Sequence, residues 1–133
     1  MKTIILLLLI TALSLPAFAQ KQIKLEEAKN HIGDSVILAG VIYDIKVFED
    51  DDKKPTLALV NLGAAYPNQI VTIAVRPELY KNTTMVFPDQ RFKGDLANVT
   101  GKLELYKGKP QIIIHSPEQL HISAGDPVVV PKQ

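Results

Sequence analysis

The chain of 133 residues contains no cysteine and no tryptophan, and only 6% of its residues are aromatic. Without cysteine, disulfides cannot hold the fold together, and thiol catalysis and thiolate metal ligands are excluded. The chain also lacks an excess of either charge, since its formal net charge is +1. A near-neutral chain has no strong overall attraction to polyanions, although a local basic patch would survive this balance.

The first nineteen residues are predicted to be a signal peptide. Lys2 supplies a positive start, residues 4–15 form an apolar run, and Ala17 and Ala19 form a small-x-small cleavage site before Gln20. The run is about a dozen residues, shorter than the ~20 that span a bilayer. No cysteine follows the site to carry a lipid anchor. Cleavage between Ala19 and Gln20 predicts a periplasmic or secreted protein with no membrane association; a retained membrane anchor is the alternative.

Cleavage would leave residues 20–133, a length of 114 residues that suffices for one domain with one hydrophobic core. We predict a single domain over 20–123 that begins with a short helix, followed by an extended tail over 124–133. Lys2 is the one charged residue removed, so the net charge of the mature chain falls to 0.

The longest run of strand-type residues, 35–48, dominates the pattern of the mature chain. Apolar residues fill every odd position over 37–47, while the even positions change from apolar to charged at Asp44 and Lys46. A strand with two buried faces in its first half and one in its second passes from one sheet to another. Gly40 lies where such a strand would bend, because glycine tolerates the kink. Long bent first strands are typical of small closed barrels.

Four more strands are predicted, at 56–62, 69–76, 95–106 and 109–115. Residues 21–31 have the spacing of a short amphipathic helix that covers one end of a barrel. Residues 77–93 lack a period and are expected to form a helix or an irregular loop. The charged segment 49–55 is interpreted as a hairpin tip, because its aspartates lack the ligand spacing of a calcium loop. The fold class is therefore all-β, with one or two short helices and a five-stranded closed or partly open Greek-key barrel.

Several motifs lie within these predicted elements. The first three strands contain VILAGVI at 36–42, LALVNLG at 57–63 and IVTIAV at 70–75, and the last two contain GDLANVTGKL at 94–103 and YKGKPQI at 106–112. With the insert between the third and fourth strands, they resemble the bacterial tRNA-anticodon-type, nucleic-acid-binding OB-fold family. The resemblance covers about residues 25–122 and implies an exported, single-domain form of that family.

The resemblance implies a binding surface on the second and third strands, bordered by the loops after strands one and four. Single-stranded nucleic acid requires stacking aromatic rings and cations along such a groove. The solvent side of these strands is predicted to carry no aromatic residue, only Thr56, Ala58, Val60, Thr72, Ala74 and Arg76. The candidate ligand-binding residues therefore lie at the edges of the surface: Lys46, Phe48, Tyr66, Asn68, Arg76, Tyr106, Lys107 and Lys109.

We interpret the chain as an exported, non-enzymatic binding module, with single-stranded nucleic acid as the ligand that the resemblance implies. The alternative is a periplasmic protein-interaction or small-ligand module of the envelope-stress type, which net neutrality and the aromatic-poor strand face favour. No catalytic residue, metal ligand or cofactor is predicted. The histidines His31, His115 and His121 do not match a common zinc spacing, and motifs for nucleophilic catalysis or phosphate binding are missing. Metal-assisted hydrolysis, as in secreted OB-fold nucleases, is a third interpretation.

Overall fold

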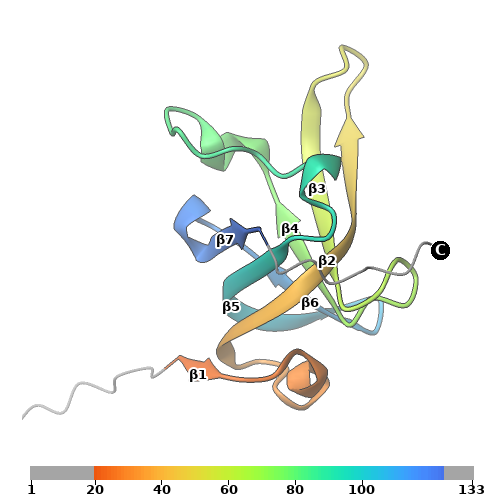
Figure 1. Cartoon of the computed structure of the whole chain (residues 1–133), viewed down its shortest axis with the longest axis vertical. Coiled ribbons are helices and arrows are strands. Elements are labelled where there is room, and N and C mark those ends of the chain that lie inside the picture. Colours follow the sequence, from red (N-terminus) through yellow and green to blue (C-terminus); the bar gives the residue numbers. More distant parts are fainter. Residues whose placement is uncertain (1–19, 125–133) are drawn as a thin grey trace, which may run out of the picture.

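In the computed structural model, residues 20–124 are described. The predicted signal peptide and the predicted tail beyond Ala124 lie outside them. No helix in the described range has both the length and the apolar character to cross a membrane. Seven strands form one sheet in the order β1-β2-β3-β4-β6-β5-β7 (Figure 1). Their bounds are β1 Lys21–Gln22, β2 Ser35–Glu49, β3 Pro55–Leu62, β4 Val71–Val75, β5 Leu96–Tyr106, β6 Lys109–Ile113 and β7 Leu120–Ser123.

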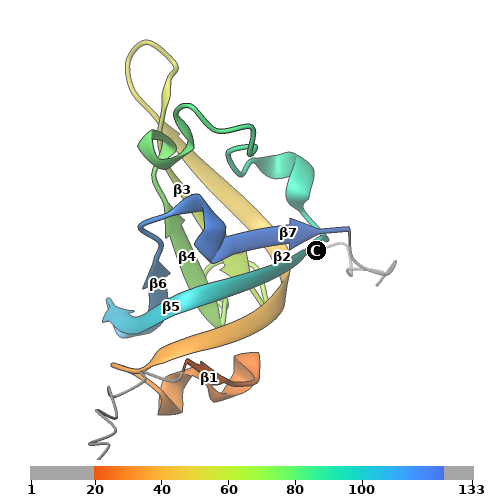
Figure 2. The same cartoon turned by 90° about the vertical axis from the view of Figure 1, so that its left-hand side faces the viewer.

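The long strand β2 belongs to both halves of the sheet. Its residues 35–41 pair with β5, and its residues 42–49 pair with β3. The change of partner falls between Val41 and Ile42, one residue beyond Gly40, and the register of pairing shifts between Ile42 and Asp44. The predicted bend in this strand is therefore confirmed, and Figure 2 shows β2 sweeping from one half to the other.

Five of the strands close into a ring. β2, β3 and β4 are joined by antiparallel pairing, β4 pairs in parallel with β6, and β6 and β2 both pair with β5. This order, with its parallel contact between the third and last strands, is that of an OB-like fold. The mostly β architecture and the ring of five strands agree with the prediction. β1 and β7 are additions that extend the edges beside β2 and β5.

The ring encloses the hydrophobic core. The sequence analysis predicted the wrong solvent-facing side for β3. Ala58 and Val60 were expected to face solvent, but both have an exposed fraction of 0% and lie in the core. The outward residues of β3 are instead Leu57, Leu59 and Asn61, which alternate with them along the strand. The prediction failed because residues 57–62 are apolar on both sides except at Asn61, so the period of two does not distinguish the faces.

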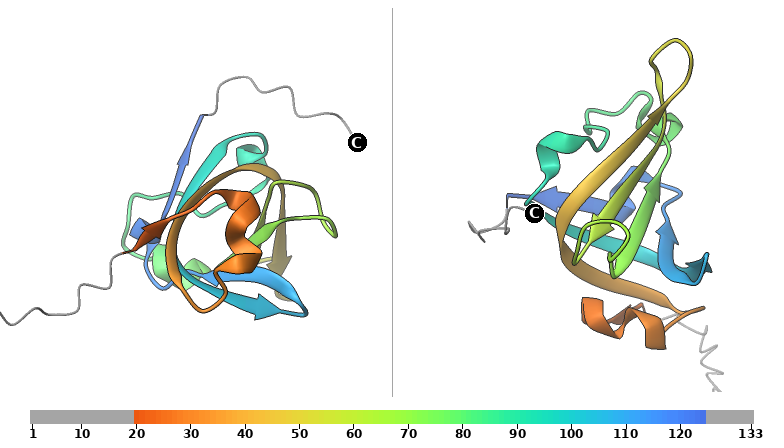
Figure 3. Two further views of the ribbon diagram at one scale, coloured as in Figure 1. Left: turned by 90° about the horizontal axis from the view of Figure 1, so that it is seen from below. Right: turned by 90° about the vertical axis from the view of Figure 1, so that its right-hand side faces the viewer.

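The helix predicted over residues 21–31 is shorter than expected. Lys21 and Gln22 form β1 beside β2, and the backbone N–H of Ile23 donates to Ile37 at 3.0 Å, so the chain stays extended there. The 3₁₀ helix η1 (Leu25–Asn30) then buries Leu25 and Ala28. It lies across one end of the ring, as predicted for a covering helix (Figure 3, left). The insert between β4 and β5 contains two more 3₁₀ helices, η2 (Pro77–Tyr80) and η3 (Gln90–Phe92), and η4 (Pro117–Gln119) precedes β7.

Two glycines of the ring allow close packing between its elements. A Cβ atom at Gly40 would lie 2.9 Å from Cδ2 of Leu25, where η1 rests on the bend of β2. A Cβ atom at Gly101 would lie only 2.6 Å from Cγ2 of Ile112, a fully buried residue of β6. Leu25 has a flexible end that can move, whereas the branched side chain of Ile112 is held in the core.

We predict that Gly101→Ala lowers the free energy of unfolding by about 1–3 kcal/mol, because the added methyl overpacks the core against Ile112. Urea unfolding monitored by circular dichroism measures the loss. In an Ile112→Ala background the same substitution should cost less, since the two sites are in contact. An equal loss in both backgrounds would contradict this packing explanation.

Candidate functional site

The outer face of the ring consists of solvent-side residues on the second half of β2 and on β3, β4, β6 and the end of β5. Cross-strand pairing arranges them in rows, because directly paired residues point to the same side of a sheet. One row, called here the polar row, crosses all five strands: Asp44, Asn61, Thr72, Gln111 and Glu104. The next row is apolar except at its first member: Lys46, Leu59, Ala74 and Ile113.

The β3–β4 loop and the β5–β6 hairpin lie at one end of this face, called here the lower end, and a hydrogen bond joins them. The Nζ atom of Lys109, at the start of β6, donates to the carbonyl oxygen of Pro67 in the β3–β4 loop. This contact places the predicted residues Tyr66 and Asn68 next to the β5–β6 hairpin, where Tyr106 pairs with Lys109. The loop and the hairpin lie at the same end of the ring in Figure 1.

Aromatic rings at this lower end are open to solvent. The exposed fraction is 71% for Tyr66 and 57% for Tyr106. The Nζ atom of Lys107 lies 5.5 Å from the centre of the Tyr106 ring, within range of a cation–π contact. Lys107 itself has φ = +49° in the turn to β6, as two-residue hairpins of this kind require.

Three of the predicted residues lie at the upper end of the face. The Nζ atom of Lys46 is 5.0 Å from the centre of the Phe48 ring, which is 39% exposed. Arg76 is exposed and directly follows β4. From Lys109 to Ile113, which lies in the same row as Lys46, β6 advances four residues, about 13 Å at a rise of ~3.3 Å per residue. The eight candidates therefore form two groups, one at each end of the outer face.

Polar side chains near the lower end form a hydrogen-bond chain that the sequence analysis missed. The Nε2 atom of Gln69 donates to Oγ1 of Thr72 at 3.2 Å, and that hydroxyl donates to Oδ1 of Asn61 at 2.9 Å. Both Thr72 and Asn61 are buried although they point outward. The available signal was Asn61, the one polar residue within the apolar run 57–62.

Two acceptors beside this chain have no hydrogen-bond partner within residues 20–124. They are Oδ1 of Asp44 and Oε1 of Gln69, and both atoms are buried. The other carboxylate oxygen of Asp44 accepts from the backbone N–H of Tyr66 at 3.4 Å, a long contact. A buried acceptor without a partner costs about 1–3 kcal/mol, so a group that donates to these oxygens would be favoured there.

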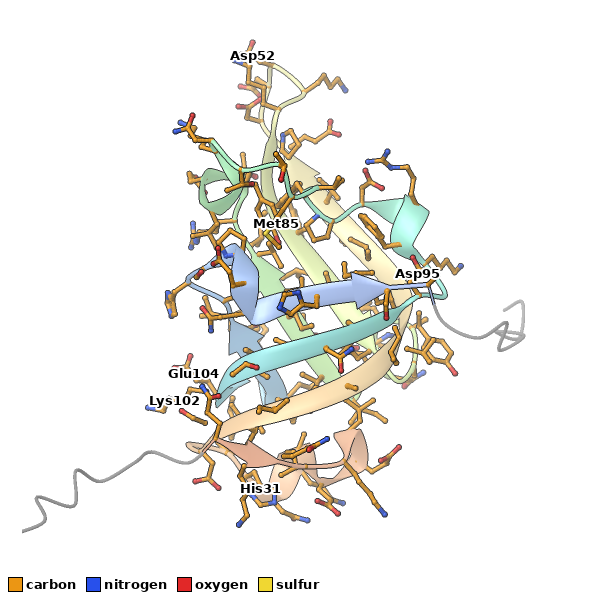
Figure 4. All side chains as sticks on the ribbon, turned by 60° about the vertical axis from the view of Figure 1, so that its left-hand side comes forward. His31, Asp52, Met85, Asp95, Lys102 and Glu104 are labelled. Atoms are coloured by element: carbon orange, nitrogen blue, oxygen red, sulfur yellow. The ribbon has the colours of Figure 1, made fainter. Side chains whose placement is uncertain are left out.

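The acidic hairpin between β2 and β3 is a turn, as predicted. Oδ1 of Asp50 accepts from the backbone N–H groups of Asp52 and Lys54 at 2.9 and 3.0 Å. Figure 4 shows Asp52 at the far tip of this hairpin. Within residues 20–124 there is no group of three or more His, Asp or Glu side chains that could hold a metal ion.

An open cleft of about 750 Å³ lies elsewhere, between the β2–β3 hairpin and the insert that precedes β5. Its one cation, Arg91, forms an ion pair with Asp89 at 2.7 Å. The side-chain hydrogen bond from Arg91 lowers the pKa of that carboxyl below its ordinary value. None of the eight candidate residues lines this cleft, whose wall consists of Val47, Glu49, Pro55, Val86, Phe87, Asp89, Gln90 and Arg91. Since Arg91 is already neutralised, we place the candidate site on the outer face.

Comparison with known proteins gives a likeness of fold only. No protein-family model matches the chain, and no curated protein sequence matches it. Among solved structures, a provisionally named aspartyl-tRNA synthetase from Leishmania major Friedlin is similar with a TM-score of 0.50 and 9% identity. The match covers 90% of this chain and 24% of the synthetase chain, so this protein spans about a quarter of that length.

Two further solved structures share less of the arrangement. A provisionally named nucleic acid-binding lipoprotein from Klebsiella pneumoniae subsp. pneumoniae MGH 78578 has a TM-score of 0.42 and 13% identity, over 72% of this chain and 75% of that one. The second OB-fold domain of replication protein A from Methanococcus maripaludis has a TM-score of 0.41 and 16% identity, over 78% of this chain and 98% of the domain.

We predict that Thr72→Val lowers the free energy of unfolding by about 1–3 kcal/mol. The substitution keeps the shape but removes the hydroxyl that links Gln69 to Asn61, leaving both side chains short of a partner. Thermal or urea unfolding measures the change. Thr100→Val is the matched control, since the Thr100 hydroxyl makes no hydrogen bond to any residue in 20–124. Equal stability of the Thr72 variant and wild type would show that the chain of hydrogen bonds contributes nothing.

Proposed function

We propose that this protein is an exported, non-enzymatic OB-fold binding module that binds single-stranded nucleic acid across the outer face. The observation that carries the proposal is the Lys109 contact to Pro67, which brings the exposed rings of Tyr66 and Tyr106 to one end of the face. Stacking of a base on an aromatic ring is worth about 1–3 kcal/mol and does not depend on base identity. Two exposed rings beside lysines therefore suit a single strand.

Cations at both ends of the outer face support the same ligand. Lys107 and Lys109 lie at the lower end, and Lys46 and Arg76 at the upper end. Lys109 and the row of Lys46 are about 13 Å apart along the strands, a span that suits an extended phosphodiester backbone meeting a cation at each end. The apolar residues between them offer contacts that carry no charge.

A binding role without catalysis is favoured by the placement of the carboxylates on this face. Asp44 and Glu104 end the polar row on opposite sides, four strand spacings apart. At ~4.8 Å per spacing the path between them along the curved sheet is about 19 Å, and side chains that point outward from different sides of a ring do not converge on one bond as a general acid and base must.

The second candidate function is a protein-interaction or small-ligand module. The acceptors of the polar row favour it, because carboxylates at Asp44 and Glu104 repel phosphate and attract donors such as ammonium or amide groups. Failure of the nucleic-acid experiment below would leave this as the leading function.

We predict that Tyr106→Ala weakens binding of labelled single-stranded DNA at least about fivefold, because a stacking ring is lost. Lys107→Ala should also weaken binding and lower the slope of log affinity against log salt by about 0.7, one phosphate contact on a single strand. Fluorescence anisotropy across a salt series measures both effects.

Lys81→Ala is the matched charge control, since Lys81 is exposed in the insert after β4 and is not one of the residues of the outer face. It should leave the affinity nearly unchanged. If wild type shows no binding at low salt, the nucleic-acid function is wrong. If both site variants bind like wild type, the residues are wrongly assigned.

Export is tested separately. Expression with the native N-terminus should yield a periplasmic or secreted protein whose mass corresponds to residues 20–133, because the Ala17-x-Ala19 site is cut. Intact-mass spectrometry of the periplasmic and medium fractions measures this. An uncut chain retained with the membrane would instead support an anchor.

A further inference from the structure

We propose that Gln20 is a modification site: once the predicted signal peptide is cut, the new N-terminal glutamine closes into a pyroglutamate lactam. The inference rests on the export part of the proposed function, because only cleavage between Ala19 and Gln20 makes the Gln20 nitrogen a free α-amine. It adds the final chemical form of the N-terminus of the exported chain. The structural support is the position of Gln20, which is exposed and lies just outside the first strand.

The chain is held to the sheet from Lys21 onward but not at Gln20. Lys21 pairs with Val36 of β2, and the backbone N–H of Ile23 donates to Ile37 at 3.0 Å. The Gln20 side chain makes no hydrogen bond to any residue in 20–124. Its amide is therefore free to fold back onto its own α-nitrogen, which is the movement that closure of the lactam ring requires.

The reaction is an intramolecular displacement that needs no co-reactant. The neutral α-amine of Gln20 attacks Cδ of its own side-chain amide, so a bond forms between the α-nitrogen and Cδ. The bond between Cδ and Nε2 breaks, a proton passes from the α-nitrogen to the leaving nitrogen, and ammonia departs. No electron is gained or lost. Because the pKa of an α-amine is about 7.7–8.0, a substantial share of this nucleophile is neutral in neutral solution.

Ring closure protects the edge of the sheet. It replaces the charged terminal ammonium group by a neutral lactam, and aminopeptidases, which act on a free α-amine, have no substrate there. Without this block, trimming past Gln22 would remove β1 and reach Ile23, which is 8% exposed and belongs to the core. The lactam therefore shields a short edge strand at a chain end, where proteolysis concentrates.

Intact-mass spectrometry of the full chain, expressed with its native N-terminus and exported, tests the modification. At harvest or after incubation at neutral pH, the mass should be lower than that of residues 20–133 by one ammonia. Tandem mass spectrometry should place this loss at Gln20. An amine label applied in neutral solution, where α-amines react ahead of lysines because their pKa is lower, should leave the N-terminus unlabelled.

Gln20→Glu is the matched variant, because it keeps the length of the side chain while its carboxylate is a far poorer target for the amine than an amide. Its mass should correspond to its own uncyclised sequence from position 20, and its N-terminus should take the label. Gln22→Glu, in β1, should lose ammonia as the wild type does, since the α-nitrogen of Gln22 is already part of a peptide bond.

The outcomes separate the modification from export. A chain that is cut before Gln20 but keeps its full mass and takes the label after incubation would keep export and overturn the modification. An uncut chain, or one cut elsewhere, would overturn both the cleavage site and the lactam. A loss of ammonia that lies at another residue, or that persists in Gln20→Glu, would overturn the assignment to Gln20.

Discussion

The change of partner along β2 is the constraint on which the rest of the structure depends. One strand pairs with β5 up to Val41 and with β3 from Ile42 onward, and this allows the sheet to curl and close through β4 and β6. Glycine at position 40 lets β2 bend while η1 rests on the same point through Leu25. Because the bend turns Asp44, Lys46 and the residues after them toward solvent, it also creates the outer face.

Two loops far apart in sequence are joined by one side chain. Lys109 reaches from the last hairpin to the carbonyl of Pro67, so the exposed tyrosines of both loops belong to a single surface. That surface combines rings and cations at its ends with acceptors and apolar residues between them. In the proposed function, a single strand would lie across the ring and gain affinity from stacking on the rings and from the cations.

The sequence predicted the fold better than the site. The period of two in residues 35–48 revealed both the strand and its bend, and turn residues such as Gly108 placed the hairpins. The sequence did not predict which face of β3 is buried, because Leu57 to Val60 are all apolar and show no alternation. Only packing in the folded ring places Ala58 and Val60 in the core. The polar row joins five strands that span residues 44–111, and no local pattern reports such pairing.

The β2–β3 hairpin that rises beyond the ring has an electrostatic consequence for polarity. Its residues 49–54 carry four acidic and two basic side chains, directly beyond the upper end of the outer face (Figure 4). The acidic hairpin would repel a polyanion that extends beyond Phe48 at the upper end. At the lower end, the lysines would let the polyanion continue. The two ends of the outer face are therefore electrostatically unequal, and a bound strand would leave the face past the lysines of the lower end rather than along the acidic hairpin.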